Sequence, residues 1–395
     1  MFAANRIALF LALCMGVATL SCVAQSSDNG KRSTQPPPIR LSALWDGRKS
    51  VDFHSVQFPR MVRASDAHFL IDPEYVLGIT ENGESRAYPT RFVSWHHIVN
   101  DRIGKPGNFS FVTITYCIVC NSGILFETPV VNNRPLSFDF YGLYNGVMAL
   151  FDTSTNSVWL QITGSAVKGP LTGRSMKTAP LLDTTWGEWK RLHPDTLVMA
   201  PDAHVKEDYE PRGSIMVRGY DSFPAAYFKP TITHKDSRLP MFEPVLAVSL
   251  PESGAAAGAA PTSILHRAYP LKAFGGKTSA VNDVLGNEPI AVLFRAGSET
   301  ASAVSRVIDG QTLNLEVRKN RLGKADYYDR ETGSRWTIEG RAVDGPLAGK
   351  SLARIDSHMS QWYGWVSYFP DTSIFGRDRE APQPSIAASA RIVAK

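Results

Sequence analysis

The residues best suited to chemistry are two cysteines three positions apart, Cys117 and Cys120, in the segment FVTITYCIVCNSGILFE. Two thiols at this spacing can form a disulfide, exchange disulfides with a substrate, or supply two ligands to a metal ion. The other two cysteines, Cys14 and Cys22, lie close to the N-terminus. A secreted domain stapled by disulfides usually scatters several cysteine pairs along its chain. The concentration of thiols at one place therefore favours chemistry over stapling.

Three interpretations of the pair stay open. In a redox site one cysteine is the catalytic thiolate and the other resolves the mixed disulfide; a nearby cation or helix N-terminus lowers the thiol pKa, and no cofactor is required. In a non-catalytic metal site, zinc or copper would need further ligands from His96, His97 or His193. In a binding or scaffold protein, the pair would form an inert disulfide. Because adjacent residues on a helix face different ways, we favour His96 as the histidine that acts with the thiols.

The chain also repeats itself. MALFDTSTNSVWLQITGSAVKGPLTG at 148–173 matches ADYYDRETGSRWTIEGRAVDGPLAG at 325–349, and in both segments the Trp follows the Asp by seven positions. Matches in this order indicate an internal duplication and predict two similar lobes. Further matches at equal spacing are Val99-Asn100-Asp101 with Val281-Asn282-Asp283, Trp186 with Trp362, Trp189 with Trp365, and Pro194 with Pro370.

Function is expected where the two copies differ. Near the positions of the two cysteines, the second copy has Arg295 and Ser298 and no thiol. Residues that both copies share are expected to serve folding, with the Trp filling a core and the Asp bracing a turn. The candidate pocket residues combine two that occur in the first copy alone with the shared Asp and Trp: Asn145, Gln161, Asp152 and Trp159.

The first 24 residues are typical of a secretory signal peptide. Arg6 precedes the apolar stretch IALFLALCMGVATL, and small residues follow it. Cleavage after Ala24 would release a soluble protein. LSC at 20–22 resembles a lipobox, and its use would instead leave a lipid on Cys22 as an anchor to a membrane. We therefore expect an exported protein, either free in the periplasm or anchored to the outer membrane as a lipoprotein.

The rest of the chain divides into three parts. Residues 25–45 are predicted to be a disordered tether because they are rich in Ser, Pro and basic residues. Residues 46–215 form the first lobe, with the Cys-x-x-Cys pair, and 216–395 form a second lobe that is a degenerate repeat. Short runs of Val, Ile, Phe, Tyr and Thr between Gly, Asn and Asp predict strands, and helices are expected at 88–99 and 185–192. The predicted class is α+β, rich in β-strands.

The net charge and the motifs limit the classes of function that the sequence supports. The net charge of +5 is small for 395 residues and no Lys/Arg block is present, so we expect no nucleic-acid partner. The sequence has no G-x-S-x-G, no Gly-rich phosphate loop and no H-E-x-x-H, so nothing supports a hydrolase or nucleotide-binding function. The expected partner is a redox protein or a small-molecule substrate, neither of which the sequence identifies.

Five blocks, in this order, resemble a bacterial family known as domain of unknown function 3179. They are GITENGESRAYP at 78–89, WHHIVND at 95–101, TYCIVCNS at 115–122, the segment at 148–173 and WGEWKRLHP at 186–194. The resemblance covers most of the mature chain and implies no established reaction. His97 stands where that family usually has Glu, and Ile118 and Asn121 replace its usual Pro and Gly. The second departure makes the turn between the cysteines less similar to a zinc knuckle.

Overall fold

The computed structural model describes residues 38–50, 53–203, 209, 229–251, 263–377, 385–386 and 392–393. The expected signal peptide at 1–24, with Cys22, lies outside the described residues, as does the expected tether up to residue 37. No helix in the described ranges is long and apolar enough to cross a membrane. We call the described residues up to 203 the first half and those from 229 onward the second half.

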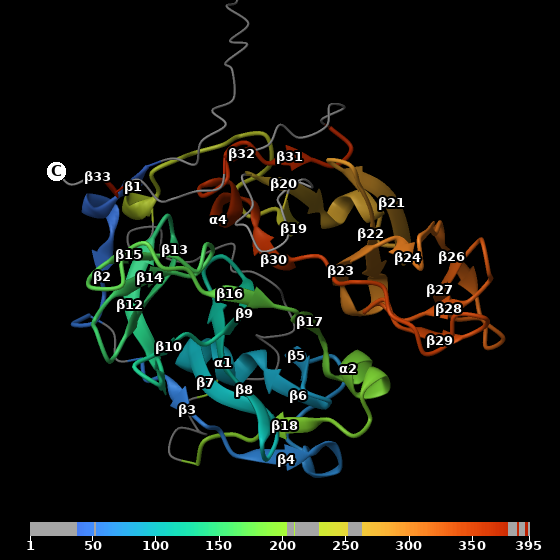
Figure 1. The fold of residues 1–395 in the computed structure, drawn as a ribbon, viewed down its shortest axis with the longest axis horizontal. Helices are drawn as coiled ribbons and strands as arrows, with labels where there is room; N and C mark the ends of the chain where they lie inside the picture. Colours follow the sequence, from blue (N-terminus) through green and yellow to red (C-terminus); the bar gives the residue numbers. More distant parts are fainter. Residues whose placement is uncertain are drawn as a thin grey trace, which may run out of the picture. The chain divides into compact units, whose positions relative to one another are not determined.

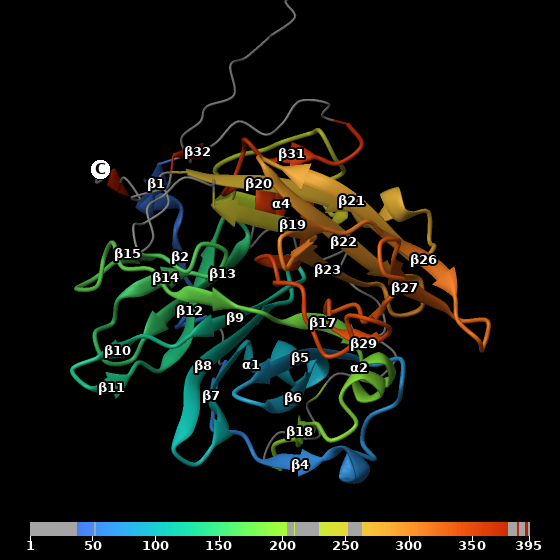
Figure 2. The ribbon, with the colours of Figure 1, turned by 45° about the vertical axis from the view of Figure 1, so that its right-hand side comes forward.

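Strands are the main element of the described chain, which confirms the β-rich class (Figure 1). The predicted β-branched and aromatic runs do form strands, because such side chains pack well on a pleated surface. Each half contributes three main sheets, drawn from blue to green and from yellow to red in Figures 1 and 2.

One sheet of the first half has the strand order β17-β5-β6-β18-β4. A sheet of the second half has the order β30-β19-β20-β31, with β32 also on β20. In both sheets one pair is parallel, β6 with β18 and β20 with β31, and the other pairs are antiparallel. The strands are β4 (Met61–Arg63), β5 (Tyr75–Glu81), β6 (Glu84–Pro89), β17 (Leu182–Thr185), β18 (Leu197–Met199), β19 (Pro244–Pro251), β20 (Ser263–Pro270), β30 (Ser357–Gln361), β31 (Ser373–Ile374) and β32 (Ser385–Ile386).

The second sheet of the first half, β16-β9-β8-β7-β3, carries the cysteines, and β21-β22-β23 is its second-half counterpart in strand order. In both, a hairpin closes with a four-residue loop, 118–121 between β8 and β9 and 296–299 between β22 and β23. The strands are β3 (Val56–Gln57), β7 (Ile98–Lys105), β8 (Asn108–Cys117), β9 (Ser122–Glu127), β16 (Lys177–Ala179), β21 (Ser279–Leu285), β22 (Glu288–Arg295) and β23 (Thr300–Ser305).

The third pair of sheets is β15-β14-β13-β12-β2 and β26-β27-β28-β29. Their strands are β2 (Trp45–Asp46), β12 (Phe138–Tyr144), β13 (Val147–Asp152), β14 (Val158–Leu160), β15 (Ala166–Lys168), β26 (Leu315–Lys319), β27 (Ala325–Asp329), β28 (Arg335–Trp336) and β29 (Ala342–Asp344). Small two-stranded sheets pair β10 (Val130–Val131) with β11 (Arg134–Pro135), β24 (Val307–Ile308) with β25 (Gln311–Thr312), and β1 (Ile39–Arg40) with β33 (Ile392–Val393).

The α-helices of the described chain are short: α1 (Thr90–His96), α2 (Trp186–Leu192) and α4 (Trp362–Val366). Helix α1 is shorter than the predicted 88–99 because it begins after Pro89 and ends where His97 takes a positive φ of 61°. Helix α2 agrees with its predicted range. It begins at Thr185, whose hydroxyl accepts a hydrogen bond from the Glu188 backbone N–H at 3.4 Å. Single 3₁₀ turns are η1 (Leu41–Ala43), η2 (Ala64–Asp66), η4 (Lys229–Thr231), η5 (Leu271–Phe274) and η6 (Ala296–Ser298).

Apolar packing joins the two halves. The core cluster around Trp159 also contains Trp362, and the cluster around Trp189 also contains Trp336. All four of these indoles are at most 1% exposed. The two halves therefore share cores, so neither expected lobe buries its tryptophans alone.

The last part of the expected tether is ordered, which corrects the predicted boundary at residue 45. Residues 39–40 form β1, 41–43 form η1, and β2 begins at Trp45. Ile39, Leu41 and Trp45 pack against the core that contains Trp159. This segment packs against the core because it carries apolar side chains among its polar ones, and these can be buried.

Candidate thiol site

The two cysteines lie at the end of the β8–β9 hairpin. Cys117 is the last residue of β8 and is paired with Ser122 of β9, and Cys120 lies in the loop between them. Asn121 has a φ of 51°, a conformation that Asn tolerates better than most residues. Its side-chain oxygen accepts a hydrogen bond from the Tyr116 hydroxyl. The run of strand-forming residues on each side thus holds the two thiols at a fixed turn.

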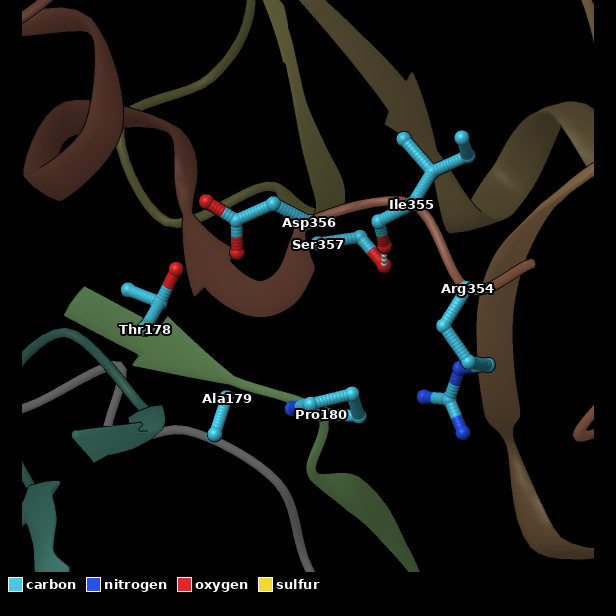
Figure 3. Close-up of a pocket in the computed structure, with 7 residues that line it drawn as sticks. All are labelled: Thr178, Ala179, Pro180, Arg354, Ile355, Asp356 and Ser357. Atoms are coloured by element: carbon cyan, nitrogen blue, oxygen red, sulfur yellow. Dashed lines mark hydrogen bonds between the residues drawn. The ribbon is translucent and has the colours of Figure 1, made fainter. Parts of the chain in front are cut away.

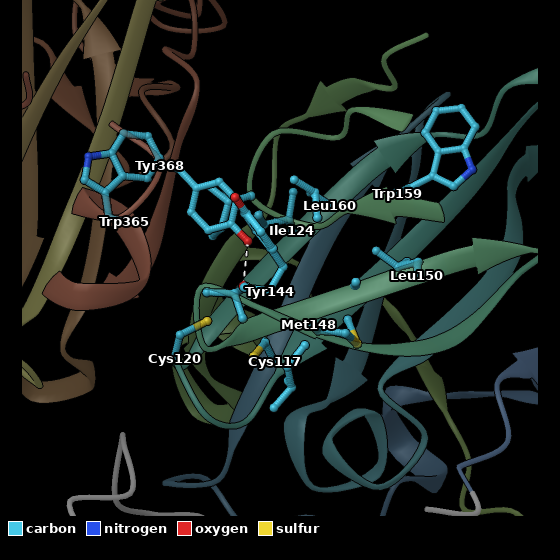
Figure 4. Close-up of a cluster of buried hydrophobic side chains, with 14 of the residues drawn as sticks. Cys117, Cys120, Ile124, Tyr144, Met148, Leu150, Trp159, Leu160, Trp365 and Tyr368 are labelled. Carbon is cyan, nitrogen blue, oxygen red and sulfur yellow. Dashed lines mark hydrogen bonds between the residues drawn. The ribbon is translucent and has the colours of Figure 1, made fainter. Parts of the chain in front are cut away.

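The thiols are free and buried. Cys117 is 1% exposed and Cys120 is fully buried (Figure 4). Reactive cysteines usually lie where solvent reaches them, because the thiolate is the nucleophile. The structure differs because α4 of the second half covers the loop. The backbone N–H of Gln361, directly before α4, donates to the Cys120 carbonyl oxygen at 2.8 Å.

The two thiols have unequal electrostatic surroundings. Burial alone would raise the pKa of Cys117, but its sulfur accepts hydrogen bonds from the Cys120 thiol and from the backbone N–H groups of Cys120, Met148 and Val119. These donors favour the thiolate, and the pKa of Cys117 is lowered. Burial, the hydrogen bond to Cys117 and the charge on Cys117 raise the pKa of Cys120 well above its ordinary value. Cys117 is therefore the cysteine that forms a thiolate more readily.

Gln161 is the predicted pocket residue that the structure brings nearest to the thiols through hydrogen bonds. Cys120 Sγ lies 2.9 Å from Ser122 Oγ, and Ser122 Oγ lies 3.4 Å from Gln161 Oε1. Gln161 Nε2 donates to Thr115 Oγ1 at 3.0 Å and to the Ser122 carbonyl oxygen at 3.1 Å. Gln161 therefore fixes the strand ends that hold the two cysteines.

The two histidines have partners other than the sulfurs. His96 Nδ1 lies 2.8 Å from the His54 carbonyl oxygen and its Nε2 lies 3.1 Å from the Tyr209 hydroxyl. Burial lowers the pKa of His96 and lowers that of His97 to about 4. His97 Nδ1 lies 3.1 Å from the Tyr116 carbonyl oxygen, and its Nε2 is buried with no hydrogen-bond partner among the described residues. Backbone N–H groups thus take the place expected for His96 as the groups that stabilise a thiolate.

Asn145, Asp152 and Trp159 serve the fold. Asn145 has a φ of 52° and joins the turn after β12 to the second half, donating to the Ser367 carbonyl oxygen at 3.2 Å. Asp152 Oδ2 accepts from Trp159 Nε1 at 3.1 Å. Trp159 lies on the other side of the buried cluster from the cysteines in Figure 4. Asp152 and Trp159 thus brace a turn and fill a core, as expected for the shared residues, whereas Asn145, which was expected to line the pocket, holds a turn.

The residues that cover the thiols were not predicted from the sequence. A Cβ atom added at Gly364 of α4 would lie 2.7 Å from the Cys120 Cβ. The Tyr363 hydroxyl donates to the Gly146 carbonyl oxygen at 3.1 Å, and the Tyr368 hydroxyl donates to the Tyr144 carbonyl oxygen at 2.8 Å (Figure 4). The available signal was the difference between WGEW at 186–189 and WYGW at 362–365 within an otherwise matching repeat.

A cavity of about 140 Å³ lies elsewhere, between β16 and the segment before β30 (Figure 3). Arg354 in its wall donates to the Leu181 carbonyl oxygen at 3.2 Å, and burial lowers the pKa of this guanidinium. Neither sulfur lines the cavity, so it is separate from the thiol site. Its lining residues are Thr178, Ala179, Pro180, Arg354, Ile355, Asp356 and Ser357.

The described residues also show which side chains near the thiols could bind a metal ion. No group of three Cys, His, Asp or Glu side chains in the described part of the chain is close enough to hold one. The ring nitrogens of His96 bond to oxygen atoms, as given above. Among the residues that the structure describes, the two thiols therefore have no third Cys, His, Asp or Glu ligand beside them.

Comparison with known proteins gives one match. The family model described as "Protein of unknown function (DUF3179)" matches residues 52–372, in agreement with the resemblance of the five sequence blocks. Neither the curated proteins nor the solved structures give a match. Because the matched range covers most of the chain and includes the thiol hairpin, the protein belongs to the DUF3179 family of proteins of unknown function.

Proposed function

We propose that this protein is an exported thiol–disulfide redox protein in which Cys117 is the nucleophile and Cys120 resolves the mixed disulfide. The observation that carries the proposal is the opposite perturbation of the two thiols. Donors lower the pKa of Cys117, whereas burial and the charge on Cys117 raise the pKa of Cys120.

The reaction balances with a disulfide as the second substrate. The Cys117 thiolate attacks one sulfur of R–S–S–R′, the S–S bond breaks, and R′S⁻ leaves and takes up a proton. The Cys120 thiol then loses its proton and attacks the Cys117 sulfur, which releases RS⁻ and leaves a Cys117–Cys120 disulfide. Two electrons pass from the protein to the substrate disulfide, and in the reverse direction the protein oxidises a dithiol.

The hydrogen bond between the thiols supports the second step, because Cys120 is already directed at the Cys117 sulfur. Ser122 lies 2.9 Å from Cys120 Sγ and is itself held by Gln161. The two sulfurs are buried, so a substrate reaches them only after part of the cover moves.

We also propose that the two halves arose by duplication and that only the first half kept the thiols. Support comes from side-chain contacts that recur at matched positions. Arg267, Tyr269 and Asp283 repeat the contacts of Arg86, Tyr88 and Asp101, with both pairs of distances 2.6 and 2.7 Å. Other recurring contacts are Asp152–Trp159 with Asp329–Trp336, Trp189–Thr196 with Trp365–Thr372, and Asn100–Phe138 with Asn282–Leu315.

The compartment is part of the proposal. An apolar N-terminal stretch with a basic residue before it supports export, and LSC at 20–22 supports lipid attachment at Cys22 as the alternative to cleavage after Ala24. In an oxidising compartment the disulfide form of such a pair can persist. Mass measurement of the mature N-terminus from cells distinguishes the lipidated form from the free form.

The test is equilibration of purified protein in glutathione buffers between about −300 and −100 mV, followed by acid quench and peptide mass mapping. The expected result is a reversible two-electron transition confined to the peptide that contains both cysteines. Mapping separates this peptide from Cys22. Thiols that stay reduced at every potential, or that are protected by one equivalent of bound zinc or copper, would refute the redox function, and the second outcome would establish the metal-binding alternative.

A further inference from the structure

Each half places its C-terminal helix on the hairpin of the other half. Helix α4 of the second half lies on loop 118–121, where Gln361 N–H donates to the Cys120 carbonyl oxygen at 2.8 Å. In the other direction, the segment of β17 and α2 lies against the strand ends that flank loop 296–299. There Thr184 Oγ1 is 2.6 Å from Thr300 Oγ1, and Glu188 Oε1 is 3.4 Å from Arg295 Nε. The two contacts are reciprocal.

The two loops correspond residue by residue. Cys117 pairs with Ser122 across its hairpin as Arg295 pairs with Thr300. The last loop residue has a positive φ in both, 51° at Asn121 and 47° at Glu299. Cys120 contacts the Ser122 hydroxyl at 2.9 Å, and its counterpart Ser298 contacts the Thr300 hydroxyl at 2.7 Å. The helices can therefore be compared position by position.

The two helices differ at one matched position, which faces Arg295 in α2 and Cys120 in α4. Glu188 stands two residues after Trp186 and one before Trp189, and Gly364 stands in the same place between Trp362 and Trp365. Glu188 supplies a carboxylate to Arg295. At Gly364, a Cβ would meet Cys120 Cβ at 2.7 Å, Ser360 Oγ at 3.3 Å and Val147 Cγ2 at 3.4 Å. A side chain at this place would displace the helix from the loop.

We propose that Gly364 is a positioning residue of the thiol site and that α4 is the element that controls access to the two sulfurs. The inference rests on the proposed function in taking the thiols to be reactive. Without a side chain at Gly364, α4 can lie directly on Cys120, keep water from both sulfurs, and hold loop 118–121 so that its N–H groups point at Cys117. The site is thus built from both halves, although both thiols come from the first.

The test compares Gly364→Ala with Glu188→Ala, which disturbs the matching contact on the other loop. Folded, reduced protein is treated with iodoacetamide, and alkylation of Cys117 and Cys120 is followed by peptide mass. The added methyl group would clash with Cys120 and should weaken the packing of α4 on the loop, so Gly364→Ala should raise the alkylation rate by about tenfold or more. It should also raise the pH at which the first thiolate forms, because the loop donors lose their alignment. Glu188→Ala should leave the alkylation rate and the thiolate titration unchanged.

An unchanged alkylation rate in folded Gly364→Ala protein would overturn the proposal, and so would an equal increase in Glu188→Ala. If Gly364→Ala fails to fold, Tyr363→Phe replaces it, since this change removes the hydrogen bond from α4 to the Gly146 carbonyl oxygen and keeps the ring. Tyr363→Phe should likewise accelerate alkylation, and an unchanged rate would overturn the proposal. Alkylation requires no disulfide, so the covering role and the redox function can fail independently.

Discussion

Removing the thiol of Cys120 should make Cys117 a weaker acid. In the structure the Cys120 thiol donates to the Cys117 sulfur, and this is the largest of the contacts that favour the Cys117 thiolate. A hydrogen bond to a charged acceptor contributes about 1.5 kcal/mol or more. Since about 1.4 kcal/mol is a factor of ten in an ionisation equilibrium, Cys120→Ala should lower the thiolate fraction of Cys117 near neutral pH about tenfold.

The assay is a pH titration of the thiolate by its ultraviolet absorbance, with the reduced protein folded throughout. Wild-type protein should show a first step from Cys117 and a second, at higher pH, from Cys120. Cys120→Ala should show one step, displaced to higher pH than the first wild-type step. Cys120→Ser is the matched control, because its hydroxyl can still donate and should retain part of the effect. A Cys120→Ala step at the wild-type position would refute the assignment of Cys117 as the activated thiol.

Three further predictions concern stability. Asp152→Ala and Asp329→Ala should each lower the free energy of unfolding in urea by about 3 kcal/mol, because each leaves a buried indole N–H without its acceptor; a cost well below 1 kcal/mol in either would contradict the matched roles. Gln161→Leu should cost about 2 kcal/mol by leaving the strand ends beside the thiols without hydrogen bonds, and an unchanged urea midpoint would argue against this. Burial lowers the pKa of His97 to about 4 and that of His266 to about 3. The unfolded chain therefore binds protons at higher pH than the folded protein, and the free energy of unfolding should fall as the pH drops from about 6.5 toward 4. The double variant His97→Phe/His266→Asn should show a weaker pH dependence of the free energy of unfolding in urea, and a dependence as steep as in the wild type would contradict this.

The sequence was sufficient for the local elements of the thiol hairpin. Alternating β-branched and aromatic residues predicted strands on both sides of the cysteines, and β8 and β9 lie there. The helix expected at 185–192 is α2, which spans Trp186–Leu192. These features depend on neighbours along the chain, so a local pattern carries enough information.

What the sequence did not predict depends on contacts between distant segments. The cover on Cys120 comes from residues about 240 positions later, and the N–H group of Met148 that points at Cys117 comes from another sheet. His96 lies near the thiols along the chain, but the end of α1 directs its ring to His54 and Tyr209. Trp45 lies in a segment whose composition indicated a tether, yet it packs against a core assembled from both halves. Composition and residue spacing along the chain carry no information about such contacts between distant segments.

The most direct test of the account is to trap the first step of the exchange. Reduced Cys120→Ala, Cys117→Ala and wild-type proteins are incubated with oxidised glutathione and mapped by peptide mass after acid quench. We expect a stable glutathione adduct on Cys117 in Cys120→Ala and little or no adduct on Cys120 in Cys117→Ala. In the wild type we expect a Cys117–Cys120 disulfide that dithiothreitol reverses. Equal adducts on both single variants, or a wild-type pair that never closes, would contradict it.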